Sequence, residues 1–198
     1  QARPWSVTLQ AGATVSGIGL EWDAFEPKFR TGFFAGAGVR LAVAERWTIP
    51  VDVRYAQRGF YYNTPGTFLV RDNQLAVYRG RVEHRAAYLD IVPQIEFRPI
   101  RRIGIAVGPY LSTRLSEAVR YGDVIGWTDT RENALFDDID LGLSAKLSGH
   151  FGPVSVFASY LHGLTDSANL PLADANGLPL GRVAAKGRAV LVGVGWAF

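Results

Sequence analysis

Cysteine is absent from the 198 residues of the sequence. Without thiols, the chain has no disulfide framework, no thiolate ligand for a metal and no cysteine nucleophile. Long hydrophobic runs are absent too: stretches such as IGIAVGPYL fall well short of the roughly 18 apolar residues that a membrane-spanning helix needs. A protein that crosses a membrane by helices is therefore excluded.

Charge of one sign is not concentrated anywhere in the chain. The formal net charge is +3 and the arginines are spread along the sequence, so the basic stripe that indicates a nucleic-acid partner is missing. We therefore expect no nucleic acid among its partners. No basic segment followed by an apolar one opens the sequence, and we expect that a signal peptide has already been removed.

A period of two recurs along the chain instead. The final segment, RAVLVGVGWAF, sets large apolar residues in one row and mostly small residues in the other. This is the period of a β-strand and not of a helix, and we expect the apolar row to face lipid. Most of the predicted strands have about ten to fourteen residues, longer than the usual five or six of soluble sheets. The strands are expected at residues 5–16, 31–43, 47–57, 85–98, 103–116, 138–148, 153–162 and 186–198.

Short and long connections alternate between these strands. The short ones are expected at 44–46, 99–101 and 149–152, and the long ones at 17–30, 58–84, 117–137 and 163–185. A strand of about twelve residues, tilted by about 40°, covers close to 30 Å, enough for the apolar band of an outer membrane. The sequence therefore predicts an all-β, eight-stranded antiparallel up-and-down transmembrane β-barrel. Residues 1–198 are expected to form one domain, with short periplasmic turns and long extracellular loops.

The alternative is a soluble eight-stranded cup of the lipocalin kind, with its apolar row turned inward around a ligand. The second row favours the membrane barrel, because it mixes small residues with charges of both signs. In so narrow a lumen these charges are expected to pair and to plug it, since a buried unpaired charge is costly. The expected ion network consists of Arg40, Asp52, Arg54, Asp90, Glu96, Arg98, Arg114, Asp140 and Lys146.

Aromatic residues collect where the strands meet the short turns. This arrangement is typical of the interfacial girdle of a membrane barrel, and it implies outer-membrane lipid as a partner. The expected girdle consists of Trp5, Trp47, Phe97, Trp196 and Phe198.

The segments RYAQRGFYY, AYLDIVPQIEF, VGPYL, DDIDLGLSAKL and SYLHGLTD occur in the order seen in PorT-like outer-membrane β-barrels. The chain resembles that family, which is common in Bacteroidetes, over nearly its whole length. The resemblance implies an eight-stranded barrel in the bacterial outer membrane with both termini in the periplasm. It also implies that Phe198 ends the signal by which such barrels are recognised for insertion, and that the last strand closes against the first. It supplies no catalytic residue and leaves the function open.

Catalytic chemistry has little support in the sequence. Of the three histidines, His84 and His150 are expected to be solvated polar residues beside a loop and a short turn. His162 extends the outward row of its strand to the rim, where lipid A deacylases have a catalytic histidine. Their nucleophilic serine lies two residues further on, at the position of Leu164. We therefore expect no catalytic residue and interpret His162 as an interfacial aromatic residue.

Two acidic segments resemble fragments of calcium loops. Asp137, Asp138 and Asp140 cluster near the predicted outer rim, and DANG occupies residues 174–177. Neither supplies the ligand series of a dedicated site. Turn formation and pairing with arginine explain both, and we expect no metal and no cofactor.

Function is therefore expected in the loops or on the barrel wall. An alternating pattern around Arg71–Asn73 predicts a hairpin that projects beyond the membrane, and the loop 163–185 is unusually apolar for a surface segment, which favours a partner. The main hypothesis is a non-enzymatic barrel with a plugged lumen and a structural or partner-binding role, for example as an accessory subunit of an envelope or secretion assembly. A protein partner is expected at loops 58–84, 117–137 and 163–185 or at the wall. The alternatives are a lipid-modifying outer-membrane enzyme and a porin-like channel for small solutes.

Overall fold

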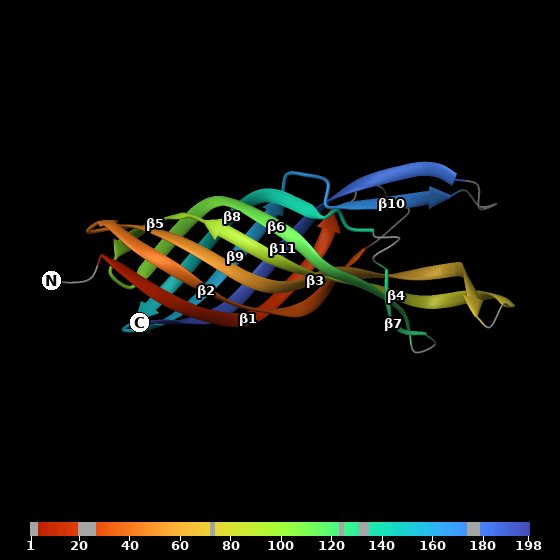
Figure 1. Ribbon diagram of the computed structural model, residues 1–198, viewed down its shortest axis with the longest axis horizontal. Coiled ribbons are helices and arrows are strands. Elements are labelled where there is room, and N and C mark those ends of the chain that lie inside the picture. The colour runs from red at the N-terminus through yellow and green to blue at the C-terminus, as the bar shows by residue number, and fades with distance from the viewer. Residues whose placement is uncertain (1–3, 20–26, 72–73, 123–124, 131–134, 174–178) are drawn as a thin grey trace.

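The computed structural model describes residues 4–19, 27–71, 74–122, 125–130, 135–173 and 179–198. These residues form an antiparallel β-barrel (Figure 1). Its strands are β1 (Trp5–Gly19), β2 (Lys28–Ala44), β3 (Trp47–Arg71), β4 (Gln74–Pro93), β5 (Ile95–Ile100), β6 (Ile103–Tyr121), β7 (Ile125–Asp129), β8 (Ile139–Phe151), β9 (Val154–Gly163), β10 (Ala168–Ala173) and β11 (Pro179–Ala197). Among the described residues, no helix is long and apolar enough to cross a membrane.

Eight strand positions, which we call staves, close the barrel. They follow the order β1, β2, β3, β4, β6, β8, β9 and β11, and β11 pairs back with β1. β5 continues the stave of β4 after an interruption at Gln94, and it pairs with β3 and β6. The closing pair runs from Thr8↔Ala197 to Gly19↔Lys186, so the ring leaves no open edge. The expected eight-stranded up-and-down barrel, with its last strand against its first, is confirmed.

The strands reach further than the sequence pattern indicated. β3 and β4 stay paired as far as Arg71↔Gln74, so most of the segment expected as the loop 58–84 is a strand hairpin. The tip residues 72–73 lie outside the described residues. Shorter pairings, β7 with β6 and β10 with β11, occupy parts of the other long connections. Beyond the lipid, neither face of a strand has to be apolar, which is why the alternation fades before the strands end.

The two ends of the barrel differ (Figure 1). Both termini and the connections β2–β3, β5–β6 and β8–β9 lie at one end, which we call the turn end. The projecting hairpins β3–β4 and β10–β11 lie at the opposite end, which we call the loop end. This arrangement confirms the expected alternation of short and long connections.

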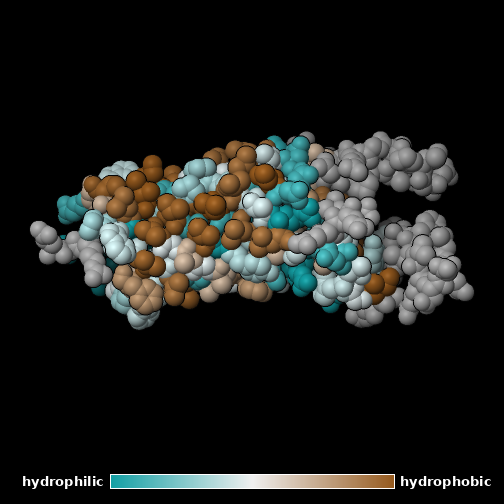
Figure 2. Space-filling view, viewed as in Figure 1, coloured by the Kyte–Doolittle hydropathy of each residue, from teal (hydrophilic) through white to brown (hydrophobic). Residues whose placement is uncertain are grey.

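The outside of the barrel carries the apolar row. Figure 2 shows hydrophobic side chains gathered over the barrel wall on the face in view. Val107, Leu143 and Val192 are each more than half exposed, at 57%, 54% and 56%. In the lipocalin-like alternative these side chains would be buried around a ligand. The outward orientation supports the membrane barrel and argues against the soluble cup.

The expected aromatic girdle lies at the turn end. Trp5, Trp47, Trp196 and Phe198 are exposed on the outside of the barrel there. Phe97 is half-buried against Trp47, with the ring centroids 4.8 Å apart. These rings therefore mark one rim of the hydrophobic band.

Candidate functional site

The lumen near the turn end is crossed by buried ion pairs. Lys146 Nζ on β8 lies 2.8 Å from Asp52 Oδ2 on β3, two strands that are not neighbours in the ring. Glu96 on β5 accepts hydrogen bonds from Arg40 Nη1 at 3.2 Å and from Arg98 Nε at 2.6 Å. Such pairs therefore cross the interior of the barrel and join strands that are not adjacent.

Asp90 is the hub of the central layer. Its Oδ2 atom accepts hydrogen bonds from Arg54 Nε at 3.2 Å and from Arg58 Nη2 at 2.6 Å. Its Oδ1 atom accepts a third hydrogen bond, from Ser112 Oγ at 2.8 Å. The carboxylate has no solvent exposure. Two guanidinium groups and a hydroxyl therefore replace the water that it loses on burial.

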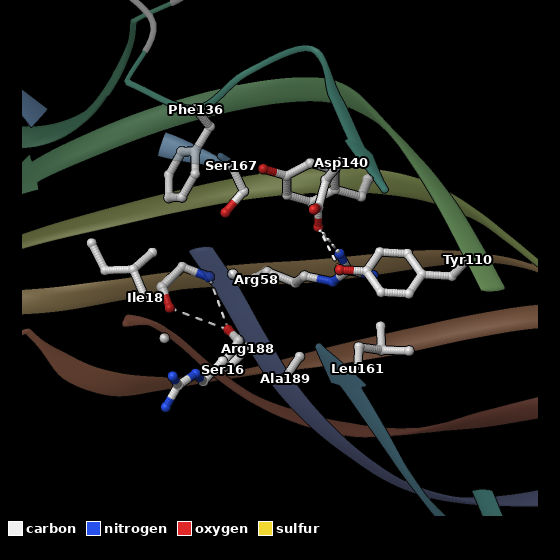
Figure 3. Close-up of a pocket in the computed structure, with 14 residues that line it drawn as sticks. Ser16, Ile18, Arg58, Tyr110, Phe136, Asp140, Leu161, Ser167, Arg188 and Ala189 are labelled. Carbon is white, nitrogen blue, oxygen red and sulfur yellow. Dashed lines mark hydrogen bonds and ion pairs between the residues drawn. The ribbon is translucent and has the colours of Figure 1, made fainter. Parts of the chain in front are cut away.

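Arg58 links this hub to a further layer of side chains, which Figure 3 shows. Arg58 Nη1 lies 3.5 Å from Asp140 Oδ2, and the Tyr110 hydroxyl donates to the same oxygen at 2.9 Å. The Arg58 guanidinium also lies over the Tyr88 ring, 5.0 Å from its centroid. The cavity between this layer and the buried Phe136 has room of about 20 Å³, enough for about one water molecule. Side chains thus fill the lumen at this level and leave no space for a larger solute.

Each of the nine charged residues expected in the ion network forms at least one ion pair. Arg114, nearest the loop end, pairs with Glu117 at 3.2 Å and with Asp138 at 2.6 Å. Arg58, Glu83 and Glu117 are additional buried charges that the sequence pattern did not indicate.

The alternation pattern missed these extra charges because strands continue past their expected ends and because one strand contains a bulge. Arg58 shares the inward parity of Arg54, but its strand was expected to end at residue 57. On β6 the pairing slips, because Ala87 pairs with Ser116 whereas the next residue, Tyr88, pairs with Arg114. This bulge reverses the inward and outward rows, so Glu117 points into the lumen.

The expectation of solvated histidines is wrong for both positions. His150 is half-buried, with Nε2 located 3.0 Å from Ser148 Oγ and 3.6 Å from Glu96 Oε1. His84, beyond the apolar band on the loop side, stacks on Phe60 with ring centroids 5.0 Å apart, and burial lowers its pKa to about 4. Both histidines lie within strands, His150 in β8 and His84 in β4, where neighbouring side chains cover them.

His162 lies on the outside of β9. Its Nδ1 atom is 3.3 Å from the Tyr160 hydroxyl, and the two rings are 6.1 Å apart. The residue at the position of the deacylase serine, Leu164, is exposed. The position shows no nucleophile beside the imidazole.

No metal-binding group is evident in the part of the chain that the structure describes, where no three His, Cys, Asp or Glu side chains lie close enough to hold an ion. Asp138 pairs with Arg114, and Asp140 lies in the lumen with Arg58. The segment 174–177 lies outside the described residues.

A second cluster, which we call the arginine–tryptophan cluster, lies at the loop end. The guanidinium groups of Arg85, Arg120 and Arg30 lie 4.3, 5.1 and 5.6 Å from the centroid of the Trp127 ring. These residues come from β2, β4, β6 and β7. They meet because the last strand ends fold around one indole, whose face attracts cations.

One carboxylate serves this cluster. Glu83 accepts hydrogen bonds from Arg30 Nε at 2.8 Å and from Arg120 Nη2 at 2.7 Å, and Arg81 Nη2 lies 3.4 Å away. Burial alone would raise the pKa of Glu83, but the hydrogen bonds and charges of Arg120 and Arg30 outweigh it and lower the pKa. Three arginines thus contact the ionised carboxylate of Glu83, and Arg85 adds a fourth guanidinium group beside Trp127, so the described residues of this cluster carry more positive than negative charge.

Comparison with known proteins identifies the architecture. A family model described as outer membrane protein beta-barrel domain matches residues 1–169. No curated protein sequence matches the chain.

Solved structures agree on the fold. The chain is similar to Ail, the attachment invasion locus protein of Yersinia pestis, in complex with the heparin analogue sucrose octasulfate (11% identity, 99% of this chain and 100% of that chain covered, TM-score 0.50). It is also similar to Neisserial surface protein A (13% identity, 97% of each chain, TM-score 0.51). A third similar structure is OprG from Pseudomonas aeruginosa (10% identity, 98% and 95%, TM-score 0.50). At these identities the likeness concerns the fold alone.

Proposed function

The chain belongs to the outer membrane protein β-barrel domain family. From that premise we propose that it is a non-enzymatic barrel of the bacterial outer membrane that binds an anionic partner at its loop end. The barrel wall is the scaffold, the filled lumen keeps the wall rigid, and the loop end carries the recognition surface. In this proposal the turn end, with both termini, faces the periplasm. The loop end then faces outward. Two of the long segments that were expected to meet a partner contribute to the cluster there: 58–84 contains Glu83, and 117–137 contains Arg120 and Trp127.

The arginine–tryptophan cluster is the observation that carries this proposal. The side chains of Arg81 and Arg120 are 48% and 39% exposed, so a ligand can reach them. Arg30 is mostly buried, and its Nη1 atom has no hydrogen-bond partner among the described residues. Guanidinium groups match sulfate and phosphate oxygens in geometry and in charge. The cluster therefore suits a ligand with several such groups.

A soluble polyanion provides the test. Sucrose octasulfate, the molecule bound in the Ail structure, carries many sulfate groups, and we propose it here as a probe of this chain. Calorimetric titration into the barrel in a non-ionic detergent at constant ionic strength should give saturable binding. Arg120→Gln should weaken that binding about tenfold, because a charge-assisted contact is lost.

Arg46→Gln is the matched control for this experiment. It removes the same charge from an exposed position in the β2–β3 turn, at the opposite end of the barrel. It should change the affinity less than twofold. Equal weakening by both variants would show a general charge effect and would contradict a site at the cluster.

The filled lumen supports the non-channel part of the proposal. Side chains from non-neighbouring strands meet at the levels of Asp52 and Asp140, Asp90 adds a fully buried hub beside them, and a buried charge network of this kind closes a barrel of eight strands. Planar-bilayer recordings should therefore show no steady single-barrel conductance. A reproducible open state would favour the porin-like alternative.

The non-enzymatic part of the proposal concerns lipid chemistry. The exposed side of β9 carries His162 beside Tyr160, with Leu164 in place of a nucleophile. Mass spectrometry of lipid A from cells that express the protein should match that from cells without it. A lipid A product that disappears on His162→Ala would favour the enzyme instead.

Finer membership in the PorT-like group of barrels is also a proposal. It is supported by the five ordered segments of the sequence that resemble that group, and it would bring an accessory role in an envelope assembly. Affinity purification from detergent-solubilised membranes of the native cell, with Arg120→Gln as the comparison, tests for a protein partner at the loop end.

A further inference from the structure

The turn end of the barrel opens into a cavity of about 620 Å³. This volume falls within the range of ordinary small-ligand sites, about 300 to 1,000 Å³. The wall formed by β2, β5, the β5–β6 turn and β8 is strongly basic. It contributes Arg40, Arg98, Arg101, Arg102 and His150 to the lining.

Positive charge exceeds negative charge in this cavity. Glu96 is shared by Arg40 at 3.2 Å and Arg98 at 2.6 Å. Arg101 and Arg102 are exposed in the β5–β6 turn, and within the described ranges neither has an ion pair. Among the described residues, the four arginines that line this cavity thus have one carboxylate partner, Glu96, which contacts two of them, and the remaining positive charge attracts an anion.

Arg40 supplies an independent observation. The residue is only 8% exposed, and its Nη1 atom donates to Glu96, yet its buried Nε atom has no hydrogen-bond partner among the described residues. A buried donor without an acceptor is costly, and native proteins rarely leave one so. Arg40 also lines the cavity, so its positive charge lies beside the space that an anion would occupy.

The lipid boundary lies at the same level. Trp5, Trp47 and Trp196 are exposed on the outside at the turn end, and such rings mark the depth of the lipid headgroups in a membrane. Phosphate groups of the adjacent leaflet are therefore close to the mouth of this cavity.

We propose that the turn-end cavity is an oxyanion site that holds a phosphate group. Arg101 and Arg102 capture the anion from the mouth, and Arg40 and Arg98 hold it from within. The phosphate comes from a phospholipid headgroup or from free phosphate, which share this chemistry. The site is independent of the arginine–tryptophan cluster, so the failure of one proposal leaves the other untouched.

The experiment compares two probes on the full chain in a non-ionic detergent. Inorganic phosphate is titrated calorimetrically at an ionic strength held constant with chloride. In the second arm, micelles are doped with equal amounts of phosphatidylglycerol and phosphatidylcholine, and native mass spectrometry counts the lipid that stays bound. Saturable phosphate binding supports free phosphate as the ligand, whereas selective retention of phosphatidylglycerol without phosphate binding supports the lipid headgroup.

The variant Arg101→Gln/Arg102→Gln tests the residues. Both side chains are exposed, so the barrel should fold, and binding of the active probe should fall at least about tenfold. The control Arg46→Gln/Arg79→Gln removes the same charge from exposed positions outside the cavity and should change binding less than twofold. Absence of binding in both arms, unchanged binding by the Arg101→Gln/Arg102→Gln variant, or equal weakening by the control would overturn the proposal.

Discussion

Replacement of Asp90 by alanine should destabilise the barrel by about 3 to 5 kcal/mol, the usual cost of breaking a buried ion pair. The carboxylate is fully buried and accepts hydrogen bonds from Arg54 at 3.2 Å, Arg58 at 2.6 Å and Ser112 at 2.8 Å. Arg58 would keep a second carboxylate, Asp140, at 3.5 Å. Arg54 forms no other ion pair among the described residues, so its charge would be left uncompensated in the lumen.

Reversible urea unfolding in lipid vesicles, followed by tryptophan fluorescence, measures this free energy. Asp138→Ala is the matched control, because that carboxylate pairs with Arg114 at 2.6 Å but is 81% exposed. Exposed pairs contribute about 0 to 1 kcal/mol. The double variant Asp90→Ala/Arg54→Met should recover part of the loss, since it removes the stranded charge. An Asp90→Ala protein as stable as the parent, or one no weaker than Asp138→Ala, would refute the reasoning.

Three further outcomes are expected. Burial lowers the pKa of His84 from 6.5 to about 4, so the unfolded chain takes up the proton first as the pH falls, and the stability present above about pH 6.5 should decline toward pH 4 by up to about 3 kcal/mol. A pH series of urea unfolding should show this decline, and the His84→Phe variant should lack it. Equal declines of the two proteins would contradict this prediction. Gly193→Ala should lower the free energy of unfolding by about 1 to 3 kcal/mol, because the added Cβ would come within 2.5 Å of the Phe34 ring. Gly126→Ala should be tolerated, because nothing lies within 4 Å of a Cβ at that position. Equal stability of the two variants in urea would count against the close packing. A spin label at Val107, which is 57% exposed, should collide more with lipid-dissolved oxygen than with a water-soluble nickel complex, and the reverse ranking would place that face in water.

The two faces of the barrel wall could be predicted from the sequence because they follow from local geometry. Successive side chains of a strand point to opposite faces, so the apolar row needs no tertiary information to be recognised. The same holds for Asp52, Arg54 and Asp90, which share the inward row of their strands. The prediction failed at two kinds of position. Glu117 lies beyond a bulge that reverses the inward and outward rows, and Arg58 lies beyond the residue at which its strand was expected to end.

Sites built from strand ends could not be predicted in this way. Trp127 attracts arginines from three other strands, and no short segment of the sequence contains that group. The turn-end cavity likewise combines residues that are far apart in the chain, such as Arg40 from β2 and Arg102 from the β5–β6 turn. His84 and His150 were interpreted as solvated because they lie beside an expected loop and a short turn, whereas in the structure His84 stacks on Phe60 and His150 contacts Ser148.

The sequence by itself determined the number of staves, the lipid-facing row and the sign of the charges inside, because each is set by a period of two and by the order of strands and turns. Only the tertiary structure decided which charges meet. Lys146 reaches Asp52 across 94 positions of the sequence, and the depth of each side chain in the lumen depends on the stagger of all the strands around the closed ring. Stagger is a property of the ring as a whole, and no single strand encodes it.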